Sequence, residues 1–166
     1  MNWTAIRADF PLLKQYPDTA YLDNAATTQR PRIVLDEMQR FYETQNANPL
    51  RGLYTLAQAA TEAYETARET IRSFIGAAGT EEIIFTRNAS ESLNLVAYSY
   101  GTFLKAGDEI LISVMEHHSN LIPWQQVCQR TGASLRFLSV DESGKITRES
   151  FESALNERTK IVALTQ

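Results

Sequence analysis

Cysteine is nearly absent from this sequence of 166 residues: the single Cys128 excludes a disulfide framework and a zinc site built from several thiolates. No apolar run approaches the roughly 20 residues that a membrane-spanning helix needs, and the first residues lack the apolar core of a secretory signal. Lys and Arg number 16 against 20 Asp and Glu, without a basic stripe, whereas neutralising phosphates needs clustered cations. We therefore expect a cytoplasmic protein with no membrane, nucleic-acid or metal partner.

The rest of the composition is that of a folded protein. Hydrophobic residues make up 43% and charged residues 22%, which excludes intrinsic disorder, and the length suits one domain. The sequence stops within Ile161-Val-Ala-Leu-Thr-Gln, which has the pattern of a buried strand with no closing helix or turn. We therefore expect one domain that is incomplete at its C-terminal end.

Strand-like and helical patterns alternate along the chain. Short runs rich in β-branched residues predict strands at 82–86, 109–113, 133–138 and 160–164. Apolar residues at helical spacing predict helices from Pro31 to a close at 46–49, at 54–75, from about Ala89, at 120–130 and at 150–156. This order predicts an α/β domain with a largely parallel sheet, in which ligands bind beyond the carboxyl ends of the strands.

Cys128, within one of these helices, is expected to be a buried packing residue rather than a reactive thiol.

Two segments follow predicted strands directly. After the first strand come Asn88, Ala89 and Ser90, where unpaired backbone N–H groups and a hydroxyl at a helix start would suit a phosphate. Taken alone, this segment fits a plain helix cap better. After the second strand come His117 and His118, which point apart and so give poor support to a shared metal. One imidazole could stack on a planar cofactor or move protons, or it could be a loop histidine bonded to the backbone.

Two segments nearer the N-terminus are further candidates. Asn24, Ala25 and Ala26, followed by two threonines, suit a tight turn or equally a wall that a ligand approaches closely. Arg51 precedes the long helix, where a guanidinium could pair with a carboxylate or phosphate, although a solvated arginine is the commoner outcome. None of these sites defines the function alone.

Taken together and in this order, four segments resemble one family. They are Tyr21-Leu-Asp-Asn-Ala-Ala-Thr-Thr, Arg51-Gly-Leu-Tyr-Thr-Leu-Ala, Glu82-Ile-Ile-Phe-Thr-Arg-Asn-Ala-Ser-Glu-Ser-Leu-Asn, and Met115-Glu-His-His-Ser-Asn-Leu-Ile-Pro-Trp. They resemble the class V aminotransferase family, and within it the cysteine desulfurase branch of the SufS or selenocysteine lyase type. The resemblance runs from about Ala8 to Gln166 and implies a fold type I, pyridoxal 5'-phosphate-dependent transferase. It implies an N-terminal segment over about 1–50 and a partial large domain over about 51–166.

The resemblance also implies roles for residues. Ala89 and Ser90 match the positions that bind the cofactor phosphate, and His117 matches the histidine that stacks on the pyridine ring and assists proton transfer. Asn24, Ala25 and Ala26 match a loop on the substrate side, and Arg51 matches a loop that reaches the active-site region, often across a homodimer. Three positions in these segments differ from the family pattern: Asn88 and Ser90 replace Gly and Thr, which keeps the turn and the hydroxyl, and Leu50 replaces a His.

The larger difference concerns groups that the family mechanism needs. These are a Schiff-base Lys in a Ser-x-His-Lys segment, an Asp against the pyridinium nitrogen and a nucleophilic Cys. None of the chain's lysines lies in such a segment, and Cys128 is not in the nucleophile's loop. We therefore expect the N-terminal part of a cysteine desulfurase, inactive alone, whose complete form turns L-cysteine into L-alanine and passes sulfur to an acceptor protein for iron–sulfur clusters. The alternatives are a non-catalytic module that binds phosphate or pairs with a family member, and another class V lyase or aminotransferase.

Overall fold

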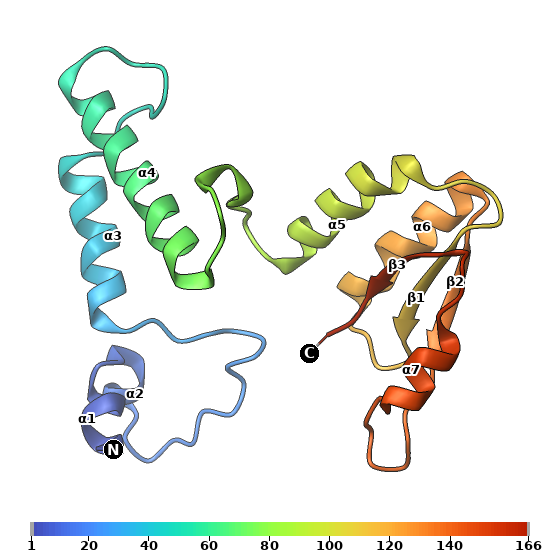
Figure 1. The fold of residues 1–166 in the computed structure, drawn as a ribbon. Coiled ribbons are helices and arrows are strands. Elements are labelled where there is room, and N and C mark those ends of the chain that lie inside the picture. The colour runs from blue at the N-terminus through green and yellow to red at the C-terminus, as the bar shows by residue number, and fades with distance from the viewer. Residues whose placement is uncertain (1, 166) are drawn as a thin grey trace. The chain divides into compact units, whose positions relative to one another are not determined.

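The computed structural model describes residues 2–165, and the chain forms two compact units, Met1–Ile83 and Ile84–Gln166 (Figure 1). Each unit is described by itself. The first contains the helices α1 (Trp3–Ala8), α2 (Pro11–Gln15), α3 (Arg32–Thr44), α4 (Thr55–Ile75) and the 3-10 turn η1 (Thr80–Glu82). The second contains α5 (Ala89–Tyr100), η2 (Gly101–Phe103), β1 (Glu109–Ser113), η3 (His118–Asn120), α6 (Ile122–Thr131), β2 (Ser134–Leu138), α7 (Arg148–Ala154) and β3 (Thr159–Ala163).

The long helix α4 dominates the first unit. It ends at Gly76, which adopts the left-handed conformation (φ 72°) that an L side chain disfavours. The N–H groups of Ala77 and Gly76 return to the carbonyls of Arg72 and Ser73, which closes the helix as a Schellman motif. Among the apolar residues whose helical spacing predicts this helix, Ala60 is buried but Phe74 is 85% exposed. The spacing therefore predicts the position of the helix correctly, but not which of its apolar residues are buried.

The strand expected at 82–86 is wrong. Residues 80–82 form η1, Ile83 has an extended backbone, and residues 83–86 belong to no strand. The Ile83 carbonyl accepts a hydrogen bond from the Arg68 guanidinium of α4 instead of from a neighbouring strand, and Ile84 is 67% exposed. A β-prone sequence without a partner for its backbone groups cannot become part of a sheet.

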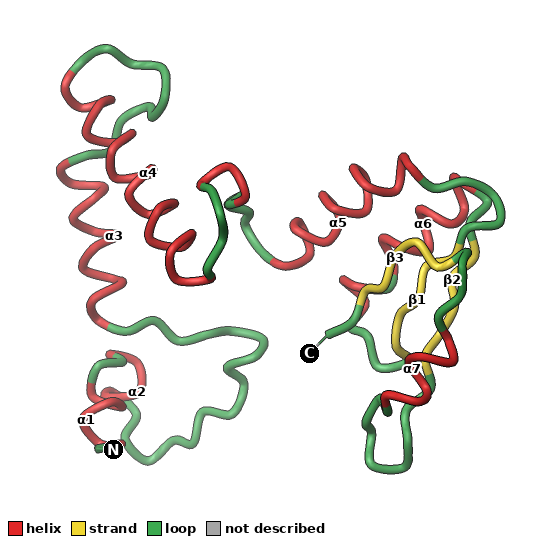
Figure 2. Tube along the Cα trace, in the orientation of Figure 1, coloured by secondary structure: helices red, strands yellow, loops and turns green. Residues whose placement is uncertain are grey.

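A parallel three-stranded sheet in the order β2-β1-β3 forms the centre of the second unit (Figure 2). Every residue of β1 is buried, as expected for a central strand of a parallel sheet. The helix α6 lies against one face of the sheet and α5 packs on α6. The core between them contains seven buried residues: Ala97, Leu104, Ile110, Ile112, Trp124, Val127 and Ala133. This confirms the α/β class with parallel strands, and the three strands of the sheet lie where the sequence predicts them.

Cys128 packs against this core, and burial raises the pKa of its thiol. This supports the packing role expected from the sequence, because a raised pKa leaves less of the reactive thiolate. No helix within residues 2–165 combines the length and apolar character needed to cross a bilayer.

Candidate functional site

The start of α5 offers unused hydrogen-bond donors. The Asn88 side chain caps the helix by accepting a hydrogen bond from the Glu91 N–H (2.9 Å). The backbone N–H groups of Ala89 and Ser90 and the Ser90 hydroxyl donate to no acceptor within residues 2–165. Both residues are exposed. A helix therefore begins here with its positive dipole end and free donors open to an anion.

Glu91 lies in the same first turn without cancelling this effect. Its carboxylate accepts hydrogen bonds from the Arg87 backbone N–H (2.6 Å) and from the Arg87 guanidinium (3.3 Å). The backbone bond is the main cause of the lowered pKa of Glu91, followed by the guanidinium. The negative charge of Glu91 is thus paired with Arg87, and the donors of Ala89 and Ser90 stay free.

His117 follows β1 and caps η3. The Ser119 backbone N–H donates to its Nδ1 (3.1 Å), and the Ser119 hydroxyl lies 2.9 Å from the same atom. Because a backbone N–H can only donate, Nδ1 is the acceptor, and the neutral ring carries its proton on Nε2. Nε2 has no partner within the described residues, and the ring is exposed. His118 lies 6.1 Å away between ring centroids at a 58° angle, so the two rings do not stack on each other.

Glu116, just before His117, is the residue that sequence reasoning missed. Its carboxylate accepts hydrogen bonds from Ser113 at the end of β1, from Asn120 at the end of η3, and from Thr165 after β3. Burial acts to raise the pKa of Glu116, but these hydrogen bonds together outweigh it and lower the pKa. The sequence contains Glu116 within the Met115–Trp124 segment, but its partner Thr165 lies 49 positions away and no local pattern connects them.

The second unit carries three of the predicted site residues on elements that pack together. Ala89 and Ser90 begin α5, His117 precedes η3, and α5 and η3 pack against each other. The chemical groups of these residues are compatible with pyridoxal phosphate: free N–H and hydroxyl donors suit the phosphate, and an exposed imidazole suits the face of a planar ring. No group of three or more His, Cys, Asp or Glu side chains between residues 2 and 165 is arranged to hold a metal ion.

The other predicted site residues belong to the first unit. Asn24 organises a turn: its carbonyl accepts from the Thr28 hydroxyl (2.9 Å) and its Oδ1 from the Gln29 N–H (2.9 Å). Ala25 and Ala26 are exposed on this turn. Arg51 is exposed and forms no ion pair with the described residues, and the preceding Leu50 has a positive φ of 72°. Their role in a site with His117 stays a prediction.

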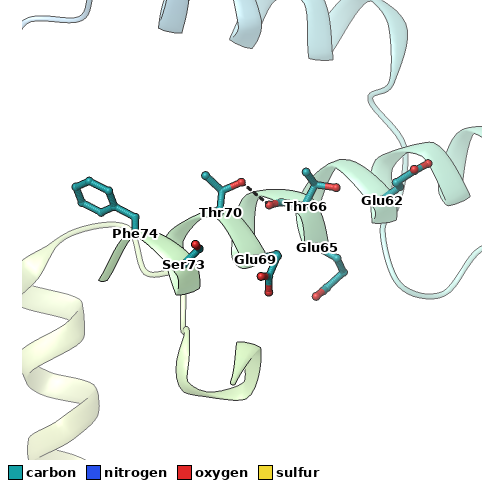
Figure 3. Close-up of a pocket in the computed structure, with 7 residues that line it drawn as sticks. All are labelled: Glu62, Glu65, Thr66, Glu69, Thr70, Ser73 and Phe74. Carbon is teal, nitrogen blue, oxygen red and sulfur yellow. Dashed lines mark hydrogen bonds between the residues drawn. The ribbon is translucent and has the colours of Figure 1, made fainter. Parts of the chain in front are cut away.

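A shallow groove of about 730 Å³ also lies in the first unit, along α4 (Figure 3). Its lining consists of Glu62, Glu65, Thr66, Glu69, Thr70, Ser73 and Phe74. None of the predicted site residues lines it. Glu65 and Glu69 are paired with arginines of the same helix, and an anionic cofactor would meet carboxylates there. The groove is therefore a poor candidate for the cofactor.

The sequence of this chain is similar to a known protein family and to proteins of known name. The sequence model of the family described as "Aminotransferase class-V" matches residues 20–166. A "Probable cysteine desulfurase" of Synechocystis sp. is 51% identical over 164 residues, which are 96% of this chain and 39% of that protein. A "Probable cysteine desulfurase 1" of Mycobacterium leprae is 48% identical over 166 residues, 98% of this chain and 27% of that protein.

Solved structures agree with these relatives. The apo cysteine desulfurase of Thermococcus onnurineus NA1 superposes with a TM-score of 0.89 at 40% identity, covering 98% of this chain and 39% of that one. The cysteine desulfurase CsdA of Escherichia coli superposes with a TM-score of 0.82 at 36% identity, covering 98% and 40%. The chain thus spans about two fifths or less of the length of these proteins.

Proposed function

The chain belongs to the class V aminotransferase family, and from this premise we propose that it is the N-terminal part of a pyridoxal-phosphate-dependent cysteine desulfurase. The complete enzyme would convert L-cysteine to L-alanine and leave the sulfur as a persulfide on an enzyme cysteine, as a supply for iron–sulfur clusters. The observation that carries this proposal is the 51% identity to a relative of that name along 96% of the chain. A homodimer, a sulfur-acceptor protein and a cytoplasmic location are parts of the same proposal.

The residues of the second unit support this function. The free N–H groups of Ala89 and Ser90 and the Ser90 hydroxyl would hold the cofactor phosphate at the start of α5. His117 would lie on the face of the cofactor ring and exchange a proton at Nε2, the ring atom that Ser119 leaves free. When bound, pyridoxal phosphate supplies an electron sink for bonds at the substrate α-carbon.

The residues of the first unit would act on the substrate side. The turn with Asn24, Ala25 and Ala26 presents small exposed side chains, which permit close approach of an amino acid. Arg51 carries an exposed guanidinium that would suit a carboxylate. In the given sequence no lysine lies in a Ser-x-His-Lys segment, so we propose that the chain alone is inactive.

A chimera tests this function. In it, the chain replaces the matched 164 residues of the Synechocystis relative, so that the remaining part of that enzyme is supplied. We expect the chimera to form alanine from L-cysteine when pyridoxal phosphate is present, and the 166-residue chain by itself to form none. The matched control is the same chimera with His117→Ala, which should retain the cofactor but lose most turnover.

Two outcomes would contradict the proposal. A folded chimera that binds the cofactor and transfers amino groups, but forms no alanine from cysteine, would indicate another class V activity. A chain that forms alanine from cysteine by itself would overturn the claim that the essential lysine and cysteine are missing from it.

A further inference from the structure

The loop between β1 and η3 is held by one carboxylate. Glu116 Oε1 accepts from the Ser113 hydroxyl (2.6 Å) and the Thr165 N–H (3.2 Å). Its Oε2 accepts from the Asn120 amide (2.7 Å) and the Thr165 hydroxyl (2.7 Å). Glu116 thereby joins the end of β1, the end of η3 and the segment after β3, and the most distant of these partners, Thr165, lies 49 positions from Glu116 in the sequence.

An ionised carboxylate satisfies all of these contacts as an acceptor. The Thr165 N–H on Oε1 can only donate. The Asn120 amide has a fixed orientation, because its oxygen accepts from the buried Trp124 indole N–H (3.0 Å), so its nitrogen must face Oε2. The same nitrogen lies 3.2 Å from the Ala163 carbonyl of β3. Each carboxylate oxygen therefore faces an obligate donor, and the NH2 of a glutamine amide at either position would leave that donor unpaired.

This network acts on the neighbouring residue. We propose that Glu116 is a positioning residue for His117: by tying the loop to the carboxyl ends of β1 and β3, it fixes the backbone from which the imidazole projects and keeps Nδ1 on the Ser119 N–H. The proton on Nε2 is then held in one place. The assignment of this imidazole to a cofactor face rests on the proposed function, whereas the link between Glu116 and the ring does not.

A comparison within the same sheet separates positioning from mere stabilisation. Glu109, at the opposite end of β1, is a buried carboxylate, whereas Glu116 is half-buried; Glu109 is held by Asn156 (2.9 Å), Arg136 (2.8 Å) and Arg158 (2.8 Å). Its partners lie on β2 and around β3, and none of them belongs to the His117 loop. Glu109→Gln therefore perturbs the sheet with no expected effect on the imidazole and is the matched control for Glu116→Gln.

Nitrogen NMR of the labelled histidines tests the inference, because the chain has two histidines and the spectrum contains few signals. In the 166-residue chain we expect His117 to show one tautomer with an acceptor-type Nδ1. In Glu116→Gln, the His117 nitrogens should shift toward the average of the two tautomers, whereas in Glu109→Gln they should keep their wild-type shifts. Wild-type His117 shifts in a folded Glu116→Gln chain would overturn the proposal.

A milder variant and a second measurement apply if Glu116→Gln does not fold. Thr165→Val removes one hydrogen bond to Oε2 and leaves the carboxylate in place, and it should shift the His117 signals in the same direction by a smaller amount.

In the chimera, Glu116→Gln should lower kcat about 10- to 100-fold with unchanged KM and cofactor content, as for a misplaced proton-transfer group. Unchanged kcat there would contradict the proposal. If the NMR shifts appear but the wild-type chimera forms no alanine, the proposed function fails and the positioning role stands.

Discussion

At the scale of single residues, the second unit contains carboxylates and hydroxyls whose roles differ by their place on the strands. Glu116 and His117 lie beyond the carboxyl end of β1, and Glu109 lies at its amino end. In an open parallel sheet ligands bind beyond the carboxyl ends of the strands, whereas Glu109 at the amino end of β1 is paired with Arg136 and Arg158. Substitutions at the two ends should therefore have different consequences.

Replacing Ser90 by alanine should weaken the binding of the cofactor. Its hydroxyl is free of protein partners among the described residues, so Ser90→Ala removes a donor without disturbing a helix cap. Because a hydrogen bond to a charged group contributes about 1.5–3 kcal/mol, we expect the dissociation constant of pyridoxal phosphate in the chimera to rise about 10- to 100-fold. Equilibrium titration measures this change, and Ser99→Ala at the other end of α5 is the control. An unchanged constant in Ser90→Ala would remove Ser90 from the phosphate site.

Glu109 should make stability depend on pH. The hydrogen bond from Asn156 is the main cause of its lowered pKa, and Arg136 and Arg158 add to it. A carboxyl whose pKa is lower in the folded than in the unfolded state stabilises the fold above its unfolded pKa of about 4.3, and this contribution is lost as the pH falls through the folded value. Urea unfolding at several pH values below neutral should thus show a stability loss that is smaller in Glu109→Gln. Equal pH slopes in both proteins would refute this role.

At the scale of elements, the close approach of η2 to α6 depends on a glycine. Gly101 has ordinary helical angles, so its backbone would accept alanine. A Cβ there would lie 2.9 Å from a methyl carbon of Val127, a fully buried and β-branched side chain that cannot turn away. The two elements can therefore pack together only because this position lacks a side chain.

Gly101→Ala should accordingly lower the free energy of unfolding by about 1–3 kcal/mol, although alanine is the better helix former. In a Val127→Ala background the space is open, so the same substitution should cost less, with a coupling energy of about 0.5–3 kcal/mol. Urea unfolding of the four proteins in this double-mutant cycle gives the coupling. Additive effects would show that the contact with Val127 is not the cause.

At the scale of the whole molecule, the two units differ in how much of their chain is buried. The central strand β1 is buried throughout, whereas α3 contains no buried residue. Local opening costs little where few apolar contacts must be broken. We therefore expect amide hydrogen exchange to require close to the global unfolding free energy, about 5 kcal/mol or more, at Ile110–Ile112, and close to zero along α3. Mass spectrometry of exchanged peptides measures both, and equal protection of α3 and β1 would contradict this expectation.

The sequence by itself determined most elements of the second unit. Helix and strand patterns repeat over a few residues, so 109–113 matches β1, 133–138 contains β2, and the start of α5 at Ala89 is correct. The helix expected at 150–156 begins two residues earlier, at Arg148, because Thr147 caps it by accepting from the Ser150 N–H. The short helices α1 and α2 were not predicted, since runs of 6 and 5 residues show too little periodicity. The candidate positions Ala89, Ser90 and His117 also came from local sequence, since each follows a run with the pattern of a strand.

The tertiary structure decided what those residues contact. The run 82–86 has the composition of a strand, yet the Ile83 carbonyl is bonded to Arg68 and no strand forms. Glu116 has no distinguishing local pattern, yet its carboxylate is bonded to Thr165 across 49 positions. Propensity and periodicity act between neighbours in the chain, whereas the partner of a backbone carbonyl or a buried carboxylate is chosen in three dimensions. The sequence therefore supplied the groups of the candidate site, and the fold determined which of them are held, paired or left free.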